Sequence, residues 1–352
     1  MVILGYILIL LLTFYLLAKI VDDYFIEALD KIATRFSMSS DAAGATLMAV
    51  GSSAPELFVA LFSVLHPGGH HEAIGIGNIV GSALFNILAI TGAVAIVRKS
   101  VLAWQPIVRD LSFYAVSILL LLWVFHDGQV ELFDAALFIG VYIIYVLVVV
   151  YWRRMTDYVD PNEEITVREE DSPSNFYLIT TMQRPVDFVI DKLFPPKKYY
   201  FLIFGISILI IAGLSWVLVE SAVQIAEILD ISEAVIGVTI LAAGTSVPDL
   251  LSSIIVSKQG RGGMAVSNAV GSNIFDILIG LGLPFLIIIL LSGGTLFLEV
   301  SGLMHSVEFL LGSVFIVFIA FLVTRWKVRT RLGIFFLLLY AAYLLWAVFT
   351  VT

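Results

Sequence analysis

The chain has 352 residues, of which 60% are apolar and only 13% are charged. Its mean hydropathy of +1.04 excludes a soluble globular protein and indicates an integral membrane protein. The net charge of −9 comes largely from one polar loop and says little about partners, and the lack of cysteine excludes disulfide, zinc-thiolate and thiol chemistry.

Ten stretches have the length and hydropathy that a helix needs to cross a bilayer. No basic region precedes the first stretch and no small-residue cleavage site follows it, so we expect a mature helix and not a removed signal. The expected spans are 2–20, 41–65, 74–97, 111–125, 132–152, 199–219, 234–257, 264–291, 307–323 and 332–351.

The positions of the basic residues predict the orientation, because Lys and Arg accumulate in cytoplasmic loops. With ten spans and the N-terminus outside, all 19 basic residues fall on the inside. The span count and the orientation support each other, and both termini are expected outside.

Several stretches outside the central polar motifs are expected to connect or support the helices. Residues 21–36 carry apolar side chains at helical spacing, which predicts an amphipathic helix at the cytoplasmic surface or under the bundle, the alternative being a solvated linker helix. The loop 66–72 holds three histidines and a glutamate, but its Gly-Gly tip favours a polar outside loop over a metal site. The fourth and fifth spans contain no expected interior ionisable residue and are interpreted as scaffold.

The long polar segment 155–198 is expected to be a cytoplasmic linker between two halves of the chain. Its acidic clusters could form a regulatory cation site, but a solvated run of charge is the preferred interpretation.

A glycine- and hydroxyl-rich motif occurs twice. Residues 44–56 read Gly-Ala-Thr-Leu-Met-Ala-Val-Gly-Ser-Ser-Ala-Pro-Glu, and residues 237–249 read Gly-Val-Thr-Ile-Leu-Ala-Ala-Gly-Thr-Ser-Val-Pro-Asp. Each copy has a continuation, Gly-Asn-Ile-Val-Gly-Ser-Ala-Leu-Phe-Asn-Ile-Leu at 77–88 and Ser-Asn-Ala-Val-Gly-Ser-Asn-Ile-Phe-Asp-Ile-Leu at 267–278. Glycines at 75, 77, 81, 262, 263 and 271 would let the motif helices approach closely.

The repeat predicts an inverted-topology architecture, because each half holds an odd number of spans and the two copies must cross the bilayer in opposite directions. We therefore expect an all-α membrane protein of two five-helix repeats. The first repeat is 1–154 with motif helices at 41–97, the linker is 155–198, and the second repeat is 199–352 with motif helices at 234–291.

Three carboxylates, Glu56, Asp249 and Asp276, lie well inside apolar spans, while no Lys or Arg lies inside any expected span. Each buried charge costs at least about 2.5–3.5 kcal/mol, so the acids must be protonated or balanced by bound cations. Neighbouring hydroxyl and amide oxygens suit Ca²⁺ or Na⁺, whereas the lack of Cys and of intramembrane His argues against zinc or copper. The wider set of neighbouring oxygen donors includes Thr46, Thr239 and Asn273, but we expect only those that flank the acids to be ligands.

Pro55 and Pro248 precede two of these acids. A helical proline cannot bond the carbonyl four residues earlier, which weakens the helix at Gly51 and Gly244. Such breaks are packing kinks in many proteins, but at membrane depth they are also tolerated where freed carbonyls line an ion site.

At these motifs the chain resembles the cation/calcium exchanger superfamily, whose α-repeats the two copies match in order and inverted. Gly-Ser-Ser-Ala-Pro-Glu, Gly-Thr-Ser-Val-Pro-Asp and Gly-Ser-Asn-Ile-Phe-Asp-Ile-Leu are most similar to the potassium-dependent sodium/calcium exchanger branch. One departure concerns Asp249, since many potassium-independent relatives carry Glu there. The shorter side chain would leave room for a second, larger cation.

The resemblance implies a central ion site. Glu56 and Asp249 would be the principal carboxylates for Ca²⁺, shared with Na⁺ during exchange, and Asn86 and Asp276 would complete the centre. Asp276 is similar to the aspartate tied to potassium dependence. The other implied oxygen donors are Ser52, Ser53, Ser82, Thr245, Ser246 and Ser272, with the carbonyls near Ala49 and Ala242.

We therefore predict an antiporter, not an enzyme, that exchanges Na⁺ for Ca²⁺ by alternating access and co-transports K⁺. Three ionised carboxylates carry −3, which Ca²⁺ plus K⁺ would neutralise, although a proton on Asp276 would give the same count. The alternatives are a Ca²⁺/H⁺ exchanger, a potassium-independent Na⁺/Ca²⁺ exchanger, a cation channel and an intramembrane aspartyl protease.

The expected partners are the three ions, as substrates, and the lipid bilayer. We expect no cofactor, no nucleic acid and no obligate protein partner. The expected location is the plasma membrane, with the loop 155–198 in the cytoplasm.

Overall fold

The computed structural model describes residues 2–35, 49–66, 71–156, 192–258, 260–298 and 302–350, which are almost entirely helical. Short π-helical segments, labelled η, interrupt several helices. The first part of the chain forms α1 (Val2–Ile20), η1 (Val21–Ile26), α2 (Glu27–Arg35), α4 (Ala49–Ser52), α5 (Ala54–Leu65), α6 (Glu72–Leu84), η3 (Phe85–Ile90), α7 (Thr91–Val97), α8 (Trp104–Asp127) and α9 (Leu132–Met155).

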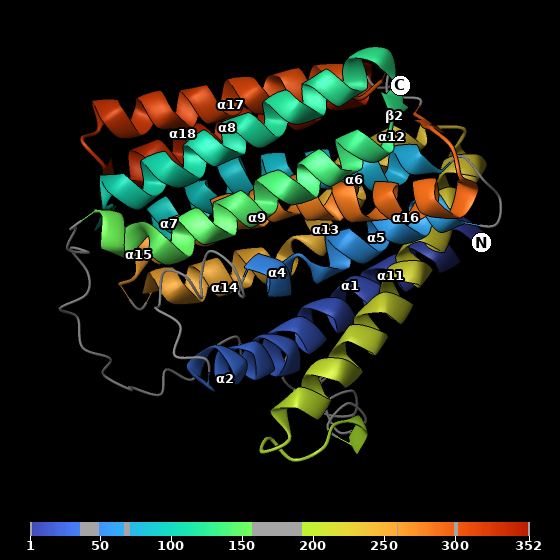
Figure 1. Cartoon of the computed structure of the whole chain (residues 1–352), viewed down its shortest axis with the longest axis horizontal. Coiled ribbons are helices and arrows are strands. Elements are labelled where there is room, and N and C mark those ends of the chain that lie inside the picture. The colour runs from blue at the N-terminus through green and yellow to red at the C-terminus, as the bar shows by residue number, and fades with distance from the viewer. Residues whose placement is uncertain are drawn as a thin grey trace.

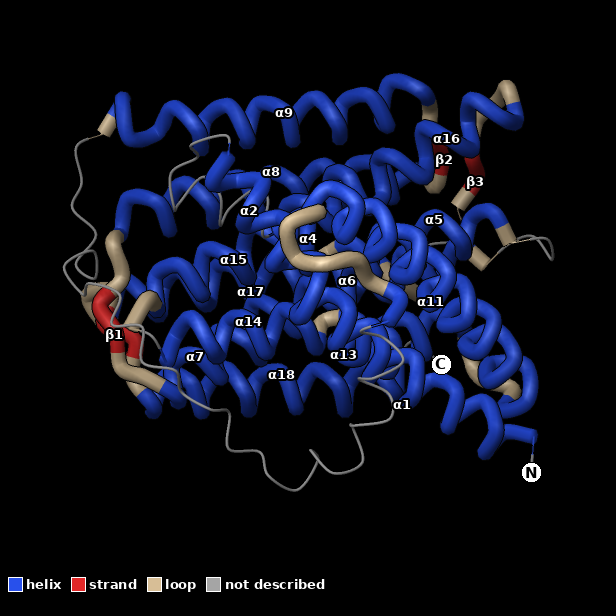
Figure 2. The backbone as a smooth tube through the Cα atoms, turned by 90° about the horizontal axis from the view of Figure 1, so that it is seen from below, coloured by secondary structure: helices blue, strands red, loops and turns tan. Residues whose placement is uncertain are grey.

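The second part repeats this pattern of long helices and short broken ones. It forms α11 (Tyr200–Leu229), α12 (Glu233–Ile236), η4 (Gly237–Leu241), α13 (Ala242–Thr245), α14 (Val247–Lys258), α15 (Gly262–Phe275), η5 (Asp276–Leu281), α16 (Gly282–Ser292), α17 (Met304–Val323) and α18 (Thr330–Thr350). Two antiparallel strand pairs, β1 (Ser100–Val101) with β4 (Lys327–Val328) and β2 (Gln129–Val130) with β3 (Leu296–Phe297), lie at opposite ends of the bundle (Figure 2).

Eight of the described helices are long and apolar enough to cross a membrane, and a ninth candidate is a pair bent by 40° between Glu233–Thr245 and Val247–Lys258. The chain is therefore a multi-pass membrane protein. Of the expected second span at 41–65, residues 41–48 lie outside the described residues, and its described part is the broken pair α4 and α5.

The prediction that no Lys or Arg lies inside a span was wrong at the fourth span. Helix α8 begins at Trp104, before the expected start at 111, and so includes Arg109 and Asp110, both buried. The Arg109 Nε lies 2.7 Å from Asp110 Oδ1, which also accepts a hydrogen bond of 3.3 Å from the Tyr145 hydroxyl of α9. Two opposite charges adjacent in the sequence can enter the bundle together because each neutralises the other, whereas a hydropathy window counts them both as barriers.

The helices form two hydrophobic cores. One core joins α1, η1, α2 and α11 with parts of α5, and the larger core joins the remaining helices, including α8, α17 and α18. In Figure 1, α1 and α11 cross on one side of the molecule, α17 and α18 lie on the opposite side, and the broken helices lie between. The repeated motifs are thus enclosed by the rest of the chain.

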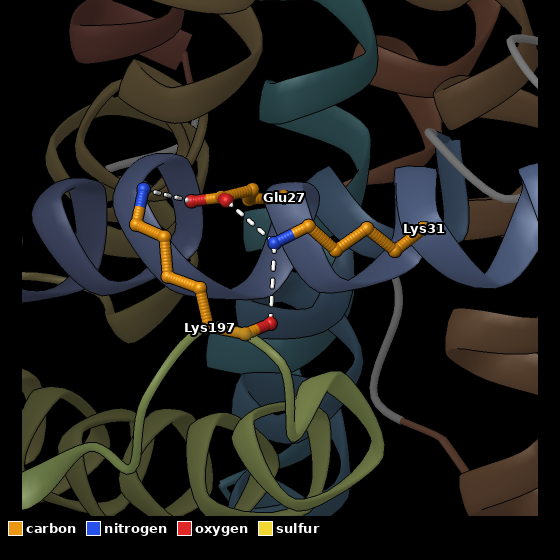
Figure 3. Close-up of polar contacts among 3 residues, drawn as sticks. All are labelled: Glu27, Lys31 and Lys197. Atoms are coloured by element: carbon orange, nitrogen blue, oxygen red, sulfur yellow. Dashed lines mark hydrogen bonds and ion pairs between the residues drawn. The ribbon is translucent and has the colours of Figure 1, made fainter.

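Polar contacts tie α2 to the segment that leads into α11. The Lys197 Nζ lies 2.7 Å from Glu27 Oε2, while Lys31 Nζ lies 2.8 Å from Glu27 Oε1 and donates to the Lys197 carbonyl oxygen at 3.2 Å (Figure 3). The hydrogen bond that Lys197 donates to the Glu27 carboxylate raises the pKa of Lys197. Helix α2 thus continues the first helix as expected for residues 21–36, as far as Arg35, where the described residues end.

The loop expected at 66–72 is described only at its two ends, since residues 67–70 lie outside the described part. His66 Nε2 lies 3.1 Å from Glu220 of α11, and His71 Nδ1 lies 2.7 Å from Glu233 of α12. In the described part of the chain, no group of three or more His, Asp or Glu residues could hold a metal ion by itself, at this loop or elsewhere.

Candidate ion-binding site

The two copies of the motif break their helices at matching residues. Ser53 lies between α4 and α5 with φ −88° and ψ 6°, and Ser246 lies between α13 and α14 with φ −85° and ψ 6°. In each copy the proline lies in the first turn of the next helix. Proline is tolerated there because a backbone N–H at that position would have no partner within the helix. The break puts Glu56 in the first turn of α5 and Asp249 in the first turn of α14, where the helix dipole favours a carboxylate.

Each continuation places its last polar residue in a π-helical segment. Asn86 lies in η3, directly after α6, and Asp276 begins η5, directly after α15. A π-helical turn holds an extra residue, displaces the side chains that follow it, and occurs often at functional sites.

Close helix crossing brings the copies together. A Cβ atom added at Gly81 of α6 would lie 2.6 Å from the Ala242 Cβ of α13, and one added at Gly237 of η4 would lie 2.7 Å from the Ile74 carbonyl oxygen. Both glycines are therefore required for the packing of α6 against the second copy. Gly75, Gly77 and Gly262 also face close neighbours, whereas Gly263 has open space around it, contrary to the expectation that it allows a close approach.

All twelve residues expected at the ion site are fully buried. Their exposed fraction is 0% for Ala49, Ser52, Ser53, Glu56, Ser82, Asn86, Ala242, Thr245, Ser246, Asp249, Ser272 and Asp276. Thr46 lies outside the described residues, and Thr239 donates its hydroxyl to the Val235 carbonyl of its own helix at 2.6 Å.

Hydrogen bonds across the copies join the acids to their expected neighbours. The Ser246 hydroxyl donates to Glu56 Oε1 at 3.2 Å, and the Asn86 Nδ2 donates to Asp249 Oδ2 at 3.1 Å and to Ser272 Oγ at 3.2 Å. The Asp276 carboxylate interacts electrostatically with both Glu56 and Asp249. Each copy thus supplies partners to the acid of the other.

The remaining hydroxyls also donate to carbonyls of their own helices. Ser52 donates to the Ala49 carbonyl at 3.4 Å, Ser82 donates to the Ile79 carbonyl at 3.0 Å, and Thr245 donates to the Leu241 carbonyl at 3.1 Å. The carbonyls of Ala49 and Ala242 each accept a backbone N–H, from Ser53 at 3.0 Å and from Ser246 at 3.3 Å. Each of these carbonyls also accepts a side-chain hydroxyl, from Ser52 at 3.4 Å and from Thr245 at 3.5 Å, so both lone pairs of each oxygen are engaged.

Six buried oxygens at this place have no hydrogen-bond partner among the described residues. They are Ser53 Oγ, Glu56 Oε2, Asn86 Oδ1, Asp249 Oδ1 and both carboxylate oxygens of Asp276. Five of them are carboxylate or amide oxygens, and a buried acceptor without a partner costs about 1–3 kcal/mol, more if it is charged. A bound cation with oxygen ligands would satisfy them, so the donor set fits a hard cation.

No base within the described residues offsets this charge. The ion pairs there involve Asp23, Glu27, Asp110 and three acids that pair with histidine, and none reaches Glu56, Asp249 or Asp276. The three carboxylates do not form a compact metal site alone, so a cation would also need amide and hydroxyl oxygens.

Two contacts at the site were not foreseen from the sequence. Thr245 Oγ1 donates to Asn78 Oδ1 at 3.2 Å, and Tyr114 of α8 bonds to Asn273 at 2.9 Å. Asn78 lies within the repeated continuation, which is a signal that could have found it. Tyr114 lies on a helix interpreted as scaffold, and no motif in the sequence identifies it as a residue of the site.

Comparisons with known proteins agree with this arrangement. Human (Homo sapiens) sodium/potassium/calcium exchanger 4 is 27% identical over 496 aligned positions, which cover 95% of this chain and 79% of that protein. Human sodium/potassium/calcium exchanger 5 is 30% identical over 408 positions, covering 95% and 81%.

A solved structure extends the similarity to three dimensions. The sodium-calcium exchanger NCX_Mj, soaked with 100 mM Na⁺ and 10 mM Sr²⁺, matches with a TM-score of 0.58 at 25% identity, over 97% of this chain and 96% of that one. The family model described as sodium/calcium exchanger protein matches residues 6–151 and 199–349, which include both motif copies and leave out the whole linker 155–198. The chain belongs to the sodium/calcium exchanger protein family.

Proposed function

We propose that this protein is a secondary antiporter that exchanges Na⁺ for Ca²⁺ and co-transports K⁺. The observation that carries the proposal is the set of buried, unpartnered oxygens on Glu56, Asn86, Asp249 and Asp276. They come from both motif copies, and no ion pair of the described residues neutralises them. The substrates are the cations themselves, so the site needs no cofactor and no catalytic residue.

Competition for the same oxygens explains the exchange. The Ca²⁺ ion would bind between Glu56 and Asp249, with Asn86 and Asp276 completing its surroundings. The flanking oxygens, from Ser52, Ser53, Ser82, Thr245, Ser246, Ser272, Ala49 and Ala242, would hold Na⁺. Because the Na⁺ set shares the two carboxylates, Na⁺ and Ca²⁺ cannot occupy the site together.

Potassium coupling has two supports. The charge of Ca²⁺ plus K⁺ balances three ionised carboxylates, and the relatives that cover most of this chain are named sodium/potassium/calcium exchangers. A proton in place of K⁺ would also balance the charge, so Ca²⁺/H⁺ exchange is the competing function.

The architecture that we propose has ten spans in two inverted five-helix repeats, 1–154 and 199–352, joined by the linker 155–198. The matching breaks at Ser53 and Ser246 and the paired segments η3 and η5 support the repeat. Placing both termini outside, in the plasma membrane, would put the linker in the cytoplasm. Movement between the helix groups of the two cores would then expose the site alternately to the two sides of the membrane.

The test is ⁴⁵Ca²⁺ uptake into proteoliposomes with Na⁺, K⁺ and pH gradients imposed separately. We expect uptake driven by the Na⁺ gradient, dependent on K⁺, and abolished by Glu56→Gln and by Asp249→Asn. Glu308→Gln, which removes an exposed carboxylate on α17, is the matched control and should keep the uptake of the unaltered protein. Uptake that follows only the pH gradient would establish Ca²⁺/H⁺ exchange instead, and full uptake by either site variant would refute the site.

A further inference from the structure

A chain of hydrogen bonds leads from a backbone carbonyl to the amide of Asn86. The Asn273 Nδ2 donates to the Ala83 carbonyl oxygen at 2.9 Å and to the Tyr114 hydroxyl at 2.9 Å. The Tyr114 hydroxyl donates in turn to the same Ala83 carbonyl at 3.3 Å. On its other side, Asn273 Oδ1 accepts a hydrogen bond of 3.0 Å from Asn86 Nδ2.

The Ala83 carbonyl fixes the orientation of the Asn273 amide. A carbonyl oxygen can only accept, so the NH₂ group of Asn273, and not its oxygen, must face it. The single proton of Tyr114 also points to Ala83, which leaves a lone pair of the hydroxyl for the second N–H of Asn273. With both N–H groups directed to this side, Asn273 Oδ1 must face Asn86.

The orientation of Asn273 fixes that of Asn86. An acceptor at Asn273 Oδ1 requires the Asn86 NH₂ group opposite it, and the two protons of this group are shared among Asn273 Oδ1, Asp249 Oδ2 and Ser272 Oγ, which all lie within 3.2 Å of the Asn86 Nδ2. The Asn86 oxygen is therefore turned to the remaining side, where it is buried and has no hydrogen-bond partner among the described residues. If the amide were reversed, an NH₂ group would occupy that place and repel a cation.

Tyr114 links the site to a helix outside the motif. It is fully buried on α8, which packs against α15, the helix that carries Asn273. A tyrosine hydroxyl is buried in a protein only at a cost unless it is bonded, and this one is bonded on both sides. Helix α8 thus contributes a polar contact to the site as well as packing.

We propose that Tyr114 and Asn273 are positioning residues that hold the Asn86 amide with its oxygen, and not its nitrogen, toward the transported cation. This inference rests on the proposed function of the site. Tyr114 and Asn273, which do not contact the ion, would thus determine which way the Asn86 amide is turned.

The test is a double-mutant cycle between Tyr114→Phe and Asn86→Asp, read as ⁴⁵Ca²⁺ binding to the purified protein and as the KM and maximum rate of uptake. Outer contacts of this kind change metal affinity by about 10–100-fold, so Tyr114→Phe should raise the KM for Ca²⁺ about tenfold or more. A carboxylate at position 86 presents oxygen in both orientations, so Asn86→Asp should still bind Ca²⁺, and adding Tyr114→Phe to it should have no further effect.

Tyr340→Phe is the matched control. It removes a buried tyrosine hydroxyl on α18 that has no hydrogen-bond partner among the described residues, so Ca²⁺ affinity should not change. An unchanged KM in Tyr114→Phe, an equal loss in the Asn86→Asp background, or loss of binding in Asn86→Asp alone would each overturn the inference. Failure of the unaltered protein to take up Ca²⁺ in exchange for Na⁺ would instead refute the proposed function, and the inference with it.

Discussion

Replacing Gly81 with alanine tests how closely the two copies must approach for the site to work. The new Cβ would lie 2.6 Å from the Ala242 Cβ and 2.7 Å from the Val238 Cα, and nearer still to the Val238 carbonyl oxygen. Ordinary contacts of this kind begin at 3.4 Å, so α6 must move away from the second copy by at least 3.4 − 2.6 = 0.8 Å. Two of the three neighbouring atoms belong to the backbone and cannot rotate away.

A displacement of this size exceeds the tolerance of about 0.5 Å within which a binding site keeps its geometry. Overpacking of a closely packed contact costs about 1–3 kcal/mol, and at 1.4 kcal/mol for each tenfold this corresponds to a loss in ion affinity of about 5- to 100-fold. The loss arises because α6 leads directly into Asn86, while Ala242 precedes Thr245 and Ser246. Movement between these helices would separate the oxygens of one copy from those of the other.

The assay is Na⁺-driven ⁴⁵Ca²⁺ uptake by Gly81→Ala, with the KM for Ca²⁺ measured beside the melting temperature in detergent. Gly140→Ala on α9 is the control, because a Cβ there meets nothing within 4 Å and alanine favours a helix by about 1 kcal/mol. It should leave uptake unchanged. Wild-type KM in Gly81→Ala would show that the copies need not lie this close, and the reasoning would then be wrong.

Two further changes test other parts of the structure. Asp276→Asn removes one of three negative charges, so Ca²⁺ uptake should continue but lose its dependence on K⁺; an unchanged response to K⁺ in proteoliposomes would contradict a role for this acid in potassium binding. Arg109→Leu leaves Asp110 buried without its partner, which costs about 3–5 kcal/mol in comparable pairs and should lower the melting temperature markedly. Replacing both residues with leucine should restore most of that stability, and a further loss in the double variant would show that the pair does more than neutralise itself.

The sequence points to the acids of the proposed site because the motif that carries them is duplicated. Glu56 and Asp249 occupy the same register of a duplicated motif, and a carboxylate in an apolar span has few structural uses. The prolines predict weakened helices at Gly51 and Gly244, and the breaks lie two residues later, at Ser53 and Ser246. The residue types within each motif were sufficient to predict the buried acids and the interrupted helices.

Other features depend on how distant helices face each other, which hydropathy does not encode. Tyr114 belongs to an apolar span, and only the packing of α8 on α15 brings its hydroxyl to Asn273. The start of α8 was placed too late because hydropathy penalises Arg109 and Asp110 separately, although the two charges bury as a pair. The π-helical segments carry no residue signature, since they depend on a shift in backbone hydrogen bonding within an otherwise ordinary helical sequence.

In the proposed site, the exchange of contacts between the copies would link ion binding to the arrangement of the whole bundle. Glu56 accepts a hydrogen bond from the Ser246 hydroxyl, and Asp249 accepts one from the Asn86 amide, so neither copy completes a site alone. Without a cation, three carboxylates would face one another with no base to balance them, and the closed arrangement would be unfavourable. Either Na⁺ or Ca²⁺ would relieve this repulsion, but only with both copies in place. A movement that separates the copies must therefore release the ion, and a movement that closes them must capture one, which is the coupling that an antiporter requires.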